Sequence, residues 1–540
     1  MKRVFSFALA AALMMAAACS EPLNEVAEEA TPQNEGAETP KKSHWGNKIE
    51  DPYSVSNMRL AYKELMKHPD NTLSKAGVSE TDIQPTHLHL KFIPKNEEEW
   101  RILKLDTILD VVPIPFNYDL EGFDGNYRDP ECPDGQPTYQ YSVVRIGHKL
   151  PNVEYEVLDS LYMPFEDDQE VRATSKNSKI NRIWDELEFE SIKLTGNLEE
   201  DDDMPSLSKK KRVTPDGYVK MKDFSNGDAT IPVPRVRVRM NFSTHHSSTY
   251  TNAEGYFKMP NSFRSRVHTH VYFDNTSYYA SERDGGEIAW YRGRVKMEKN
   301  EVMTMDNEDK ANYAATIMRA AYDYYTNSKS IKCPPQNKHI PIGLKTKNNG
   351  YAIFYTTEFG GHYIDNNQDR IFIVESALCK DKNKVKGYTT SDEDIFGKTI
   401  EIYATTIYGL SYISLKNFAK VPSTADPSLL NESYCACVSY VFATDKYGDK
   451  YNPRDFRNNY TKFNSGFFID MIDGIDVANA DYVEGYTLPQ IEKLLSSKNV
   501  VVLKDVADLM PSVCTNSTSD GIKDLMYHWV DWSNGNFNRH

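Results

Sequence analysis

The feature that most constrains this chain is its N-terminus, which holds the longest continuously apolar stretch of the sequence. Lys2 and Arg3 precede an uncharged segment, Val4 to Ala18, and Cys19 follows it directly. A helix that spans a bilayer needs about 20 apolar residues, so this segment is too short to cross one comfortably. No later stretch reaches about 18 apolar residues, so the sequence predicts no transmembrane helix. The pattern is typical of an export signal.

Small residues lead directly into Cys19, as they do in bacterial lipoprotein signals. Ala16 stands where such signals usually carry Leu. We expect cleavage before Cys19 and acylation of this cysteine with chains such as palmitate, each buried CH₂ contributing about 0.8 kcal/mol to anchoring. An ordinary secretory signal, cleaved after Ala18, is the alternative. The expected location is the cell envelope: export by the general secretory route and a lipid anchor in the outer membrane, on its periplasmic or its surface face.

Composition narrows the remaining possibilities. The chain has 540 residues, with 63 Lys and Arg against 78 Asp and Glu, a net charge of −15. This balance argues against nucleic acid as a partner, because phosphates favour clustered basic residues. Aromatic residues reach 12%, so most of the chain should fold. We expect a multidomain α+β protein with these parts: a signal peptide (1–18), a flexible acidic tether (19–54), an N-terminal α+β domain (55–190), a β-sandwich with a charged insert loop (191–300) and a mostly helical domain (301–540).

Hydrophobic periodicity predicts the elements of the N-terminal domain. His87 and His89 share one face of an expected strand, which is compatible with a metal site. Without a third ligand, we expect two solvated strand residues instead. Met58–Lys67 is expected to be an amphipathic helix, with Leu60, Leu65 and Met66 near helical spacing, and Glu97–Leu105 a helix with Trp100, Leu103 and Leu105 inward. Ser178–Glu190 is a further expected helix, and the expected strands are His87–Ile93, Val111–Tyr118 and Thr138–Ile146.

The clearest β pattern follows between about residues 217 and 295. Arg235–Met240 alternates arginine with Val and Met, which predicts a strand with one charged and one apolar face. Gly255 is expected in a tight turn. His268 and His270 share a strand face, and His245–His246 is expected in a loop. We expect structural rather than metal-binding roles for these histidines.

The C-terminal part is expected to be mainly helical. Thr487 and Gln490 form a capping-box pattern at one helix start. Six cysteines remain beyond Cys19, and their scattered spacing fits no zinc motif. The expected helices are Asp309–Thr326, Ile400–Asn417, Asn431–Asp445, Tyr460–Asp473, Pro489–Ser496 and Asp520–Trp529, with short strands around Ile340, Tyr351–Tyr355 and Ile371–Val374.

Several segments, in this order along the chain, resemble a group of lipoproteins of the Bacteroidota type. Those proteins have a tethered α+β region, a carboxypeptidase-regulatory-like β-sandwich and a C-terminal zinc-metallopeptidase (gluzincin-like) domain. The resemblance covers most of residues 55–535. Each segment alone is a weak indication of the family, and the shared order of the segments carries the resemblance. They are PTHLHLKFIPKNEEEW, PIPFNYDL, GNYRDPECPDG, ESIKLTGN, YAATIMRAAYDYY, IYATTI, NESYCACVSY, FIDMIDGID and GYTLPQIEKLL.

In members with a complete site, the resemblance implies a His-Glu-x-x-His helix after Thr-Thr-Ile and a carboxylate ligand on a later helix. Here Tyr408 and Tyr412 occupy the two histidine positions, and Gly409 occupies the position of the general base. Glu432 alone remains of the ligand set. A phenol with a pKa near 10 is a poor zinc ligand, and glycine accepts no proton. We therefore expect no catalytic residue, no metal and no cofactor.

Tyr408, Tyr412 and Glu432 have two possible roles. They either pack in place of the lost metal site or line a cleft that grips a peptide or sugar. The leading hypothesis is a non-catalytic lipoprotein, a pseudoenzyme, whose partners are the bilayer and an unidentified protein, peptide or glycan. The alternatives are an active metal-dependent hydrolase, with a site around His362 or the strand histidines, and a glycan-binding surface protein that uses the sandwich.

Overall fold

The structure is a computed structural model of the full chain. It describes residues 45–68, 72–120, 128–164, 179–198, 212–264, 267–282, 287–288, 290–295, 300–306, 310–327, 329–336, 338–345, 362–365, 370–374, 399–419, 428–451, 466–472, 483–498, 500–513 and 519–526. Helices and several sheets make it an α+β protein. In these described ranges, no helix combines the length and hydropathy needed to cross a membrane.

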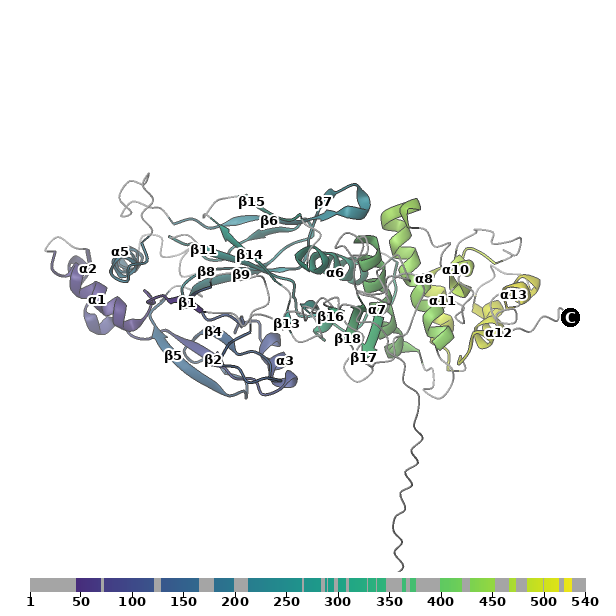
Figure 1. Ribbon diagram of the computed structural model, residues 1–540, viewed down its shortest axis with the longest axis horizontal. Coiled ribbons are helices and arrows are strands. Elements are labelled where there is room, and N and C mark those ends of the chain that lie inside the picture. Colours follow the sequence, from purple (N-terminus) through teal and green to yellow (C-terminus); the bar gives the residue numbers. More distant parts are fainter. Residues whose placement is uncertain are drawn as a thin grey trace, which may run out of the picture. The chain divides into compact units, whose positions relative to one another are not determined.

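The N-terminal part is built around an antiparallel sheet of order β4-β2-β5 (Figure 1). Asn96 caps the N-terminus of helix α3, because its side chain accepts a hydrogen bond from the backbone of Glu99, and the helix buries Trp100 and Leu103. The elements are β1 (Trp45–Lys48), α1 (Val55–Leu65), α2 (Thr72–Ala76), β2 (His87–Phe92), α3 (Glu97–Leu105), β3 (Tyr118–Leu120), β4 (Gln140–Arg145), β5 (Tyr155–Leu161) and α5 (Lys179–Leu194).

Two sheets follow, and apolar residues of both belong to one hydrophobic cluster. The first has the order β10-β6-β15, with β7 also paired to β6, and the second has the order β14-β11-β8-β9; we call the second the β8 sheet. The strands are β6 (Asp216–Asp223), β7 (Ala229–Pro232), β8 (Arg237–Phe242), β9 (His245–Tyr250), β10 (Tyr256–Lys258), β11 (Val267–Tyr272), β14 (Trp290–Val295) and β15 (Glu301–Met305).

A mixed sheet of order β13-β12-β16-β18-β17 connects this region to the C-terminal helices. Strands β12, β16 and β18 run parallel to one another. Strands from the two sides of residue 300, the expected domain boundary, pair with each other. Strand β15 pairs with β6, and β16 pairs with β12. The strands are β12 (Tyr278–Glu282), β13 (Glu287–Ile288), β16 (Ile340–Lys345), β17 (His362–Asp365) and β18 (Arg370–Val374).

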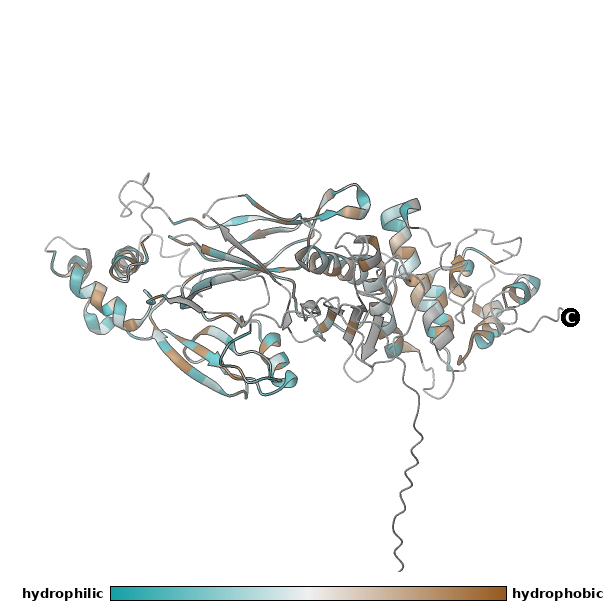
Figure 2. Cartoon of the chain, viewed as in Figure 1, coloured by the Kyte–Doolittle hydropathy of each residue, from teal (hydrophilic) through white to brown (hydrophobic). Residues whose placement is uncertain are grey.

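The C-terminal helices bury apolar residues in the same cluster as the two sheets around β6 and β8. In α11, Ile491, Leu494 and Leu495 are fully buried, and the capping box at Thr487 is present as predicted. The last helices show hydrophobic and hydrophilic residues side by side, as one buried and one exposed face requires (Figure 2). The helices are α6 (Lys310–Tyr325), α7 (Thr399–Phe418), α8 (Ser428–Tyr447), α10 (Phe467–Ile472), α11 (Leu488–Leu495), α12 (Leu503–Val513) and α13 (Ser519–Met526).

Some predicted elements differ from the structure. The predicted strand Val111–Tyr118 is mostly irregular, because only Val112 bridges to Tyr141 before β3 begins. In α1 the buried residues are Asn57, Met58 and Ala61, whereas Leu60 is 54% exposed, so the buried face differs from the apolar spacing that predicted the helix. Strand β5 and helix α12 were not predicted. Tyr351–Tyr355 and half of Tyr460–Asp473 lie outside the described residues.

Candidate functional site

The predicted degenerate site lies on helices α7 and α8. Tyr408 is buried in the hydrophobic core at 4% exposure, and Tyr412 is half-buried against the same core. Glu432 falls in the first turns of α8, and its side chain lies outside what the structure describes. The two helices pack on each other, with the hydroxyl of Ser439 donating to the Ala404 carbonyl at 2.7 Å. The structure thus brings the two helices together and places both tyrosines in or against the core.

Gly409 is in close contact with the mixed sheet. A Cβ atom added to Gly409 would lie 2.6 Å from Cγ2 of Ile371 and 2.9 Å from its Cδ1. Ile371 belongs to β18 and is fully buried, so it has little freedom to move away. The position that would carry a general base therefore has no room for even one carbon atom.

A buried carboxylate, Glu492, lies near α8, and no motif in the sequence indicates it. Tyr434 donates its hydroxyl to Oε1 of Glu492 at 2.8 Å, and the backbone of Lys332 donates to the same oxygen at 2.9 Å. Burial raises the pKa of Glu492, and these hydrogen bonds oppose the rise. The capping box locates the start of α11, but no sequence pattern pairs its glutamate with a tyrosine 58 positions earlier.

The described residues include no group of three or more His, Cys, Asp or Glu side chains that could hold a metal ion. His362, the residue named for a possible hydrolase site, lies in β17. Glu358, a carboxylate four residues earlier, lies outside the described residues. The two positions to which the resemblance assigns zinc-binding histidines carry phenols, Tyr408 and Tyr412, which are poor zinc ligands. The described residues therefore offer no ligand set for the alternative hypothesis of a metal-dependent hydrolase.

The most elaborate polar site lies on one face of the β8 sheet. Val238 and Met240 point into the core, while Arg237 and Arg239 alternate with them on the other face. This charged face was predicted, but it is buried: Arg239 is only 1% exposed. The N-terminal part covers it through Asp110 and Phe116.

Asp110 is the acidic centre of this face. Its carboxylate pairs with the guanidinium groups of both Arg237 and Arg239, and it also accepts a hydrogen bond from Ser248. Burial would raise the pKa of Asp110, but the two guanidinium groups hold it well below its usual range. Arg237 is further bound by Asp274, which accepts from Nε at 3.0 Å and from Nη2 at 2.8 Å. This bidentate pairing fixes Arg237 rigidly.

Arg239 is less completely bound than Arg237. Its Nε donates to Oδ2 of Asp110 at 3.0 Å, and its guanidinium lies over the Phe116 ring at 4.4 Å from the centroid. The Nη2 atom is buried and has no hydrogen-bond partner among the residues that the structure describes. Unsatisfied buried charged donors are costly in native proteins.

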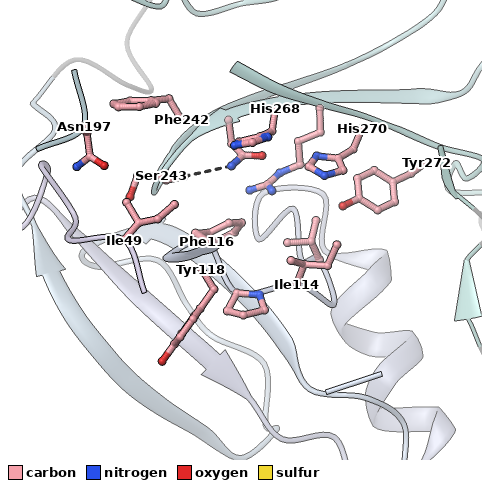
Figure 3. A pocket seen from close by; sticks show the side chains of 14 residues that line it. Ile49, Ile114, Phe116, Tyr118, Asn197, Phe242, Ser243, His268, His270 and Tyr272 are labelled. Carbon is pink, nitrogen blue, oxygen red and sulfur yellow. Dashed lines mark hydrogen bonds between the residues drawn. The ribbon is translucent and has the colours of Figure 1, made fainter. Parts of the chain in front are cut away.

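A pocket of about 60 Å³ lies between this face and the N-terminal part, with Arg239 in its lining. Figure 3 shows His268, His270 and Tyr272 along one side, with Ile114 and Phe116 below them. The remaining lining residues are Ile49, Val112, Pro115, Tyr118, Asn197, Asn241, Phe242 and Ser243.

The histidines occupy different environments from those expected. His87 and His89 lie on β2 as predicted but are buried, at 4% and 2% exposure, rather than solvated. Burial, with smaller contributions from His246 and Arg239, lowers the pKa of His89 to about 3, so its ring is neutral. His245 and His246 lie in β9 and not in a loop, because β9 pairs in register with β8.

One signal could have identified the polar face from the sequence. Arg237 and Arg239 alternate on one strand, and His268 and His270 alternate on another; the structure pairs His270 with Arg239. Two strands that each alternate polar and apolar residues suggest a common polar face, but nothing local shows that the strands pair or that this face is covered.

Comparison with known proteins adds no identification. No protein-family model matches the chain, and no curated protein is similar to it at a significant level.

Proposed function

We propose that this protein is a membrane-anchored lipoprotein of the cell envelope that is non-catalytic and serves binding or assembly. The C-terminal part from about residue 301 would be a degenerate zinc-peptidase fold. The sheets around β6 and β8 would form a carboxypeptidase-regulatory-like β-sandwich. Cys19 would carry the lipid.

The close approach at Gly409 carries this proposal. A general base at this position would need space that Ile371 fills, as the 2.6 Å distance from the added Cβ indicates. Tyr408, at the first ligand position, packs in the core at 4% exposure. Both observations favour packing over a repurposed cleft at these positions, so binding would use another surface.

Two features support the assignment of the sheets to a sandwich. The β6 and β8 sheets contribute to one hydrophobic cluster, and Gly255 has the positive φ of 72° that its predicted turn requires. A glycan-binding role for this region remains the second candidate, because aromatic side chains line the pocket beside the β8 sheet.

The catalytic part of the proposal is tested on the purified full chain. Metal analysis should find far less than one zinc per chain, and a broad peptide library should show no hydrolysis that a chelator abolishes. Stoichiometric zinc together with chelator-sensitive hydrolysis would overturn the proposal and favour the metal-dependent hydrolase.

The anchoring part is tested with Cys19→Ser in the native host. Metabolic labelling with palmitate should mark the wild type and the control Ser20→Ala, but not Cys19→Ser. Equal labelling of Cys19→Ser and wild type would refute lipidation at this residue.

A further inference from the structure

The pocket beside the β8 sheet has a lining that is rich in donors. Arg239 supplies a permanent positive charge, and Asn241, His268 and His270 add polar groups. None of the described residues that line the pocket is acidic. A cavity with this composition favours an acceptor-rich, negatively charged occupant.

Asp110 accepts a hydrogen bond from Nε of Arg239 but provides no acceptor for Nη2. Its Oδ1 pairs with Arg237, and its Oδ2 already accepts from Nε of Arg239 and from Ser248. Nη2 of Arg239, buried and without a partner in the described part of the chain, therefore needs an acceptor from elsewhere. An oxygen atom in the pocket would meet this need.

We propose that this pocket binds a small organic carboxylate, with Arg239 as the cationic partner. A carboxylate accepts hydrogen bonds from guanidinium nitrogens in matching planar geometry. Ile114 and Phe116 offer an apolar wall for a short carbon chain. The proposal goes beyond the binding role proposed above and concerns a part of the molecule separate from α7.

The volume limits the size of the ligand. One water molecule needs a cavity of about 10–15 Å³, and an apolar cavity of about 150 Å³ holds benzene. The 60 Å³ here suits a carboxylate with two or three carbon atoms. Ile49, Tyr118 and His268 are only half-buried, so a longer ligand could extend past them. The carboxylate could thus belong to a free short-chain acid or to the end of a peptide.

Propionate is the probe for the direct test. Ligand-observed NMR on the full chain in detergent should detect binding, with a dissociation constant on the order of millimolar because the ligand has few atoms. Propionamide has the same shape without the charge and should bind at least about tenfold more weakly. Equal binding of the acid and the amide would overturn the proposal, as would no propionate binding at all.

Variants on one strand and its flank locate the site. Arg239→Met should weaken propionate binding by about tenfold or more, whereas the matched control Arg235→Met, which alters an exposed arginine, should not change it. If Arg239→Met fails to fold, Ile49→Trp serves instead, because it fills the pocket and leaves Arg239 intact. Wild-type affinity in the folded Arg239→Met or Ile49→Trp variant would refute the site.

A short peptide acid and its C-terminal amide distinguish the two sources of the carboxylate. Displacement of propionate by the acid alone would assign the site to a chain end, and failure to displace would assign it to a free small acid. Zinc and peptidase measurements report on α7 and not on this pocket. A failure of either proposal is therefore recognised independently of the other.

Discussion

The contact between Gly409 and Ile371 allows a sharp test of how α7 packs. Alanine favours a helix over glycine by about 1 kcal/mol, so Gly409→Ala should stabilise an unobstructed helix. Here the new Cβ would lie 2.6 Å from Cγ2, 2.9 Å from Cδ1 and 3.0 Å from Cγ1 of Ile371. Overpacking of a core costs about 1–3 kcal/mol. The clash should outweigh the helix preference, and the net loss should be about 1 kcal/mol.

Ile371→Ala separates the two contributions, because it removes all three atoms that the new Cβ would meet. Alone it should cost about 2–5 kcal/mol through the cavity it leaves. In that background Gly409→Ala should become neutral or stabilising by up to about 1 kcal/mol. The double-mutant cycle should therefore show a coupling of about 1–2 kcal/mol.

Urea unfolding, followed by far-ultraviolet circular dichroism, gives the four stabilities of the cycle. Asn417→Ala is the control, because Asn417 is an exposed residue of the same helix. Its effect should add to that of Ile371→Ala without coupling. Stabilisation by Gly409→Ala in the wild-type background, or a cycle without coupling, would refute the packing argument and with it the case against a general base at this position.

Other perturbations test the polar face and the helix ends. Asp110→Asn, which suits the positive φ of 44° at this position, should cost about 3–5 kcal/mol in urea unfolding, because it removes the carboxylate that pairs with Arg239 and one of the two that pair with Arg237. A loss below about 1 kcal/mol would contradict this role. Burial lowers the pKa of Lys104 to about 7, against about 10.4 in an unfolded chain, so the folded state releases a proton that the unfolded state keeps. Stability should therefore rise between about pH 7 and 10 by up to about 4 kcal/mol relative to Lys104→Met, and a flat difference across this range would disprove the shift. Thr487→Ala should destabilise the chain by about 1 kcal/mol through loss of the capping box with Gln490, and an unchanged midpoint of thermal unfolding would count against that cap.

Local patterns predicted many of the elements. Glu97–Leu105 forms a helix with the predicted bounds, and the alternation predicted over Arg235–Met240 appears in β8, which begins two residues later at Arg237. These predictions hold because side chains at periods of about 3.6 and 2 select helix and strand with little help from distant residues. The lack of zinc-binding side chains at Tyr408, Gly409 and Tyr412 was also visible in the sequence, since ligand chemistry depends on residue type.

Tertiary structure alone decided that the charged face of β8 is buried and ion-paired. The sequence predicted its charge, but Asp110 comes from 127 positions earlier and turns a solvated face into a buried ion-pair network. The same long-range packing buried His89, left Val111–Tyr118 irregular and enclosed the pocket around Arg239. Periodicity reports which side chains share a face, whereas burial depends on which distant segment covers that face. Only the folded chain determines this burial, and the proposed carboxylate pocket beside Arg239 depends on it.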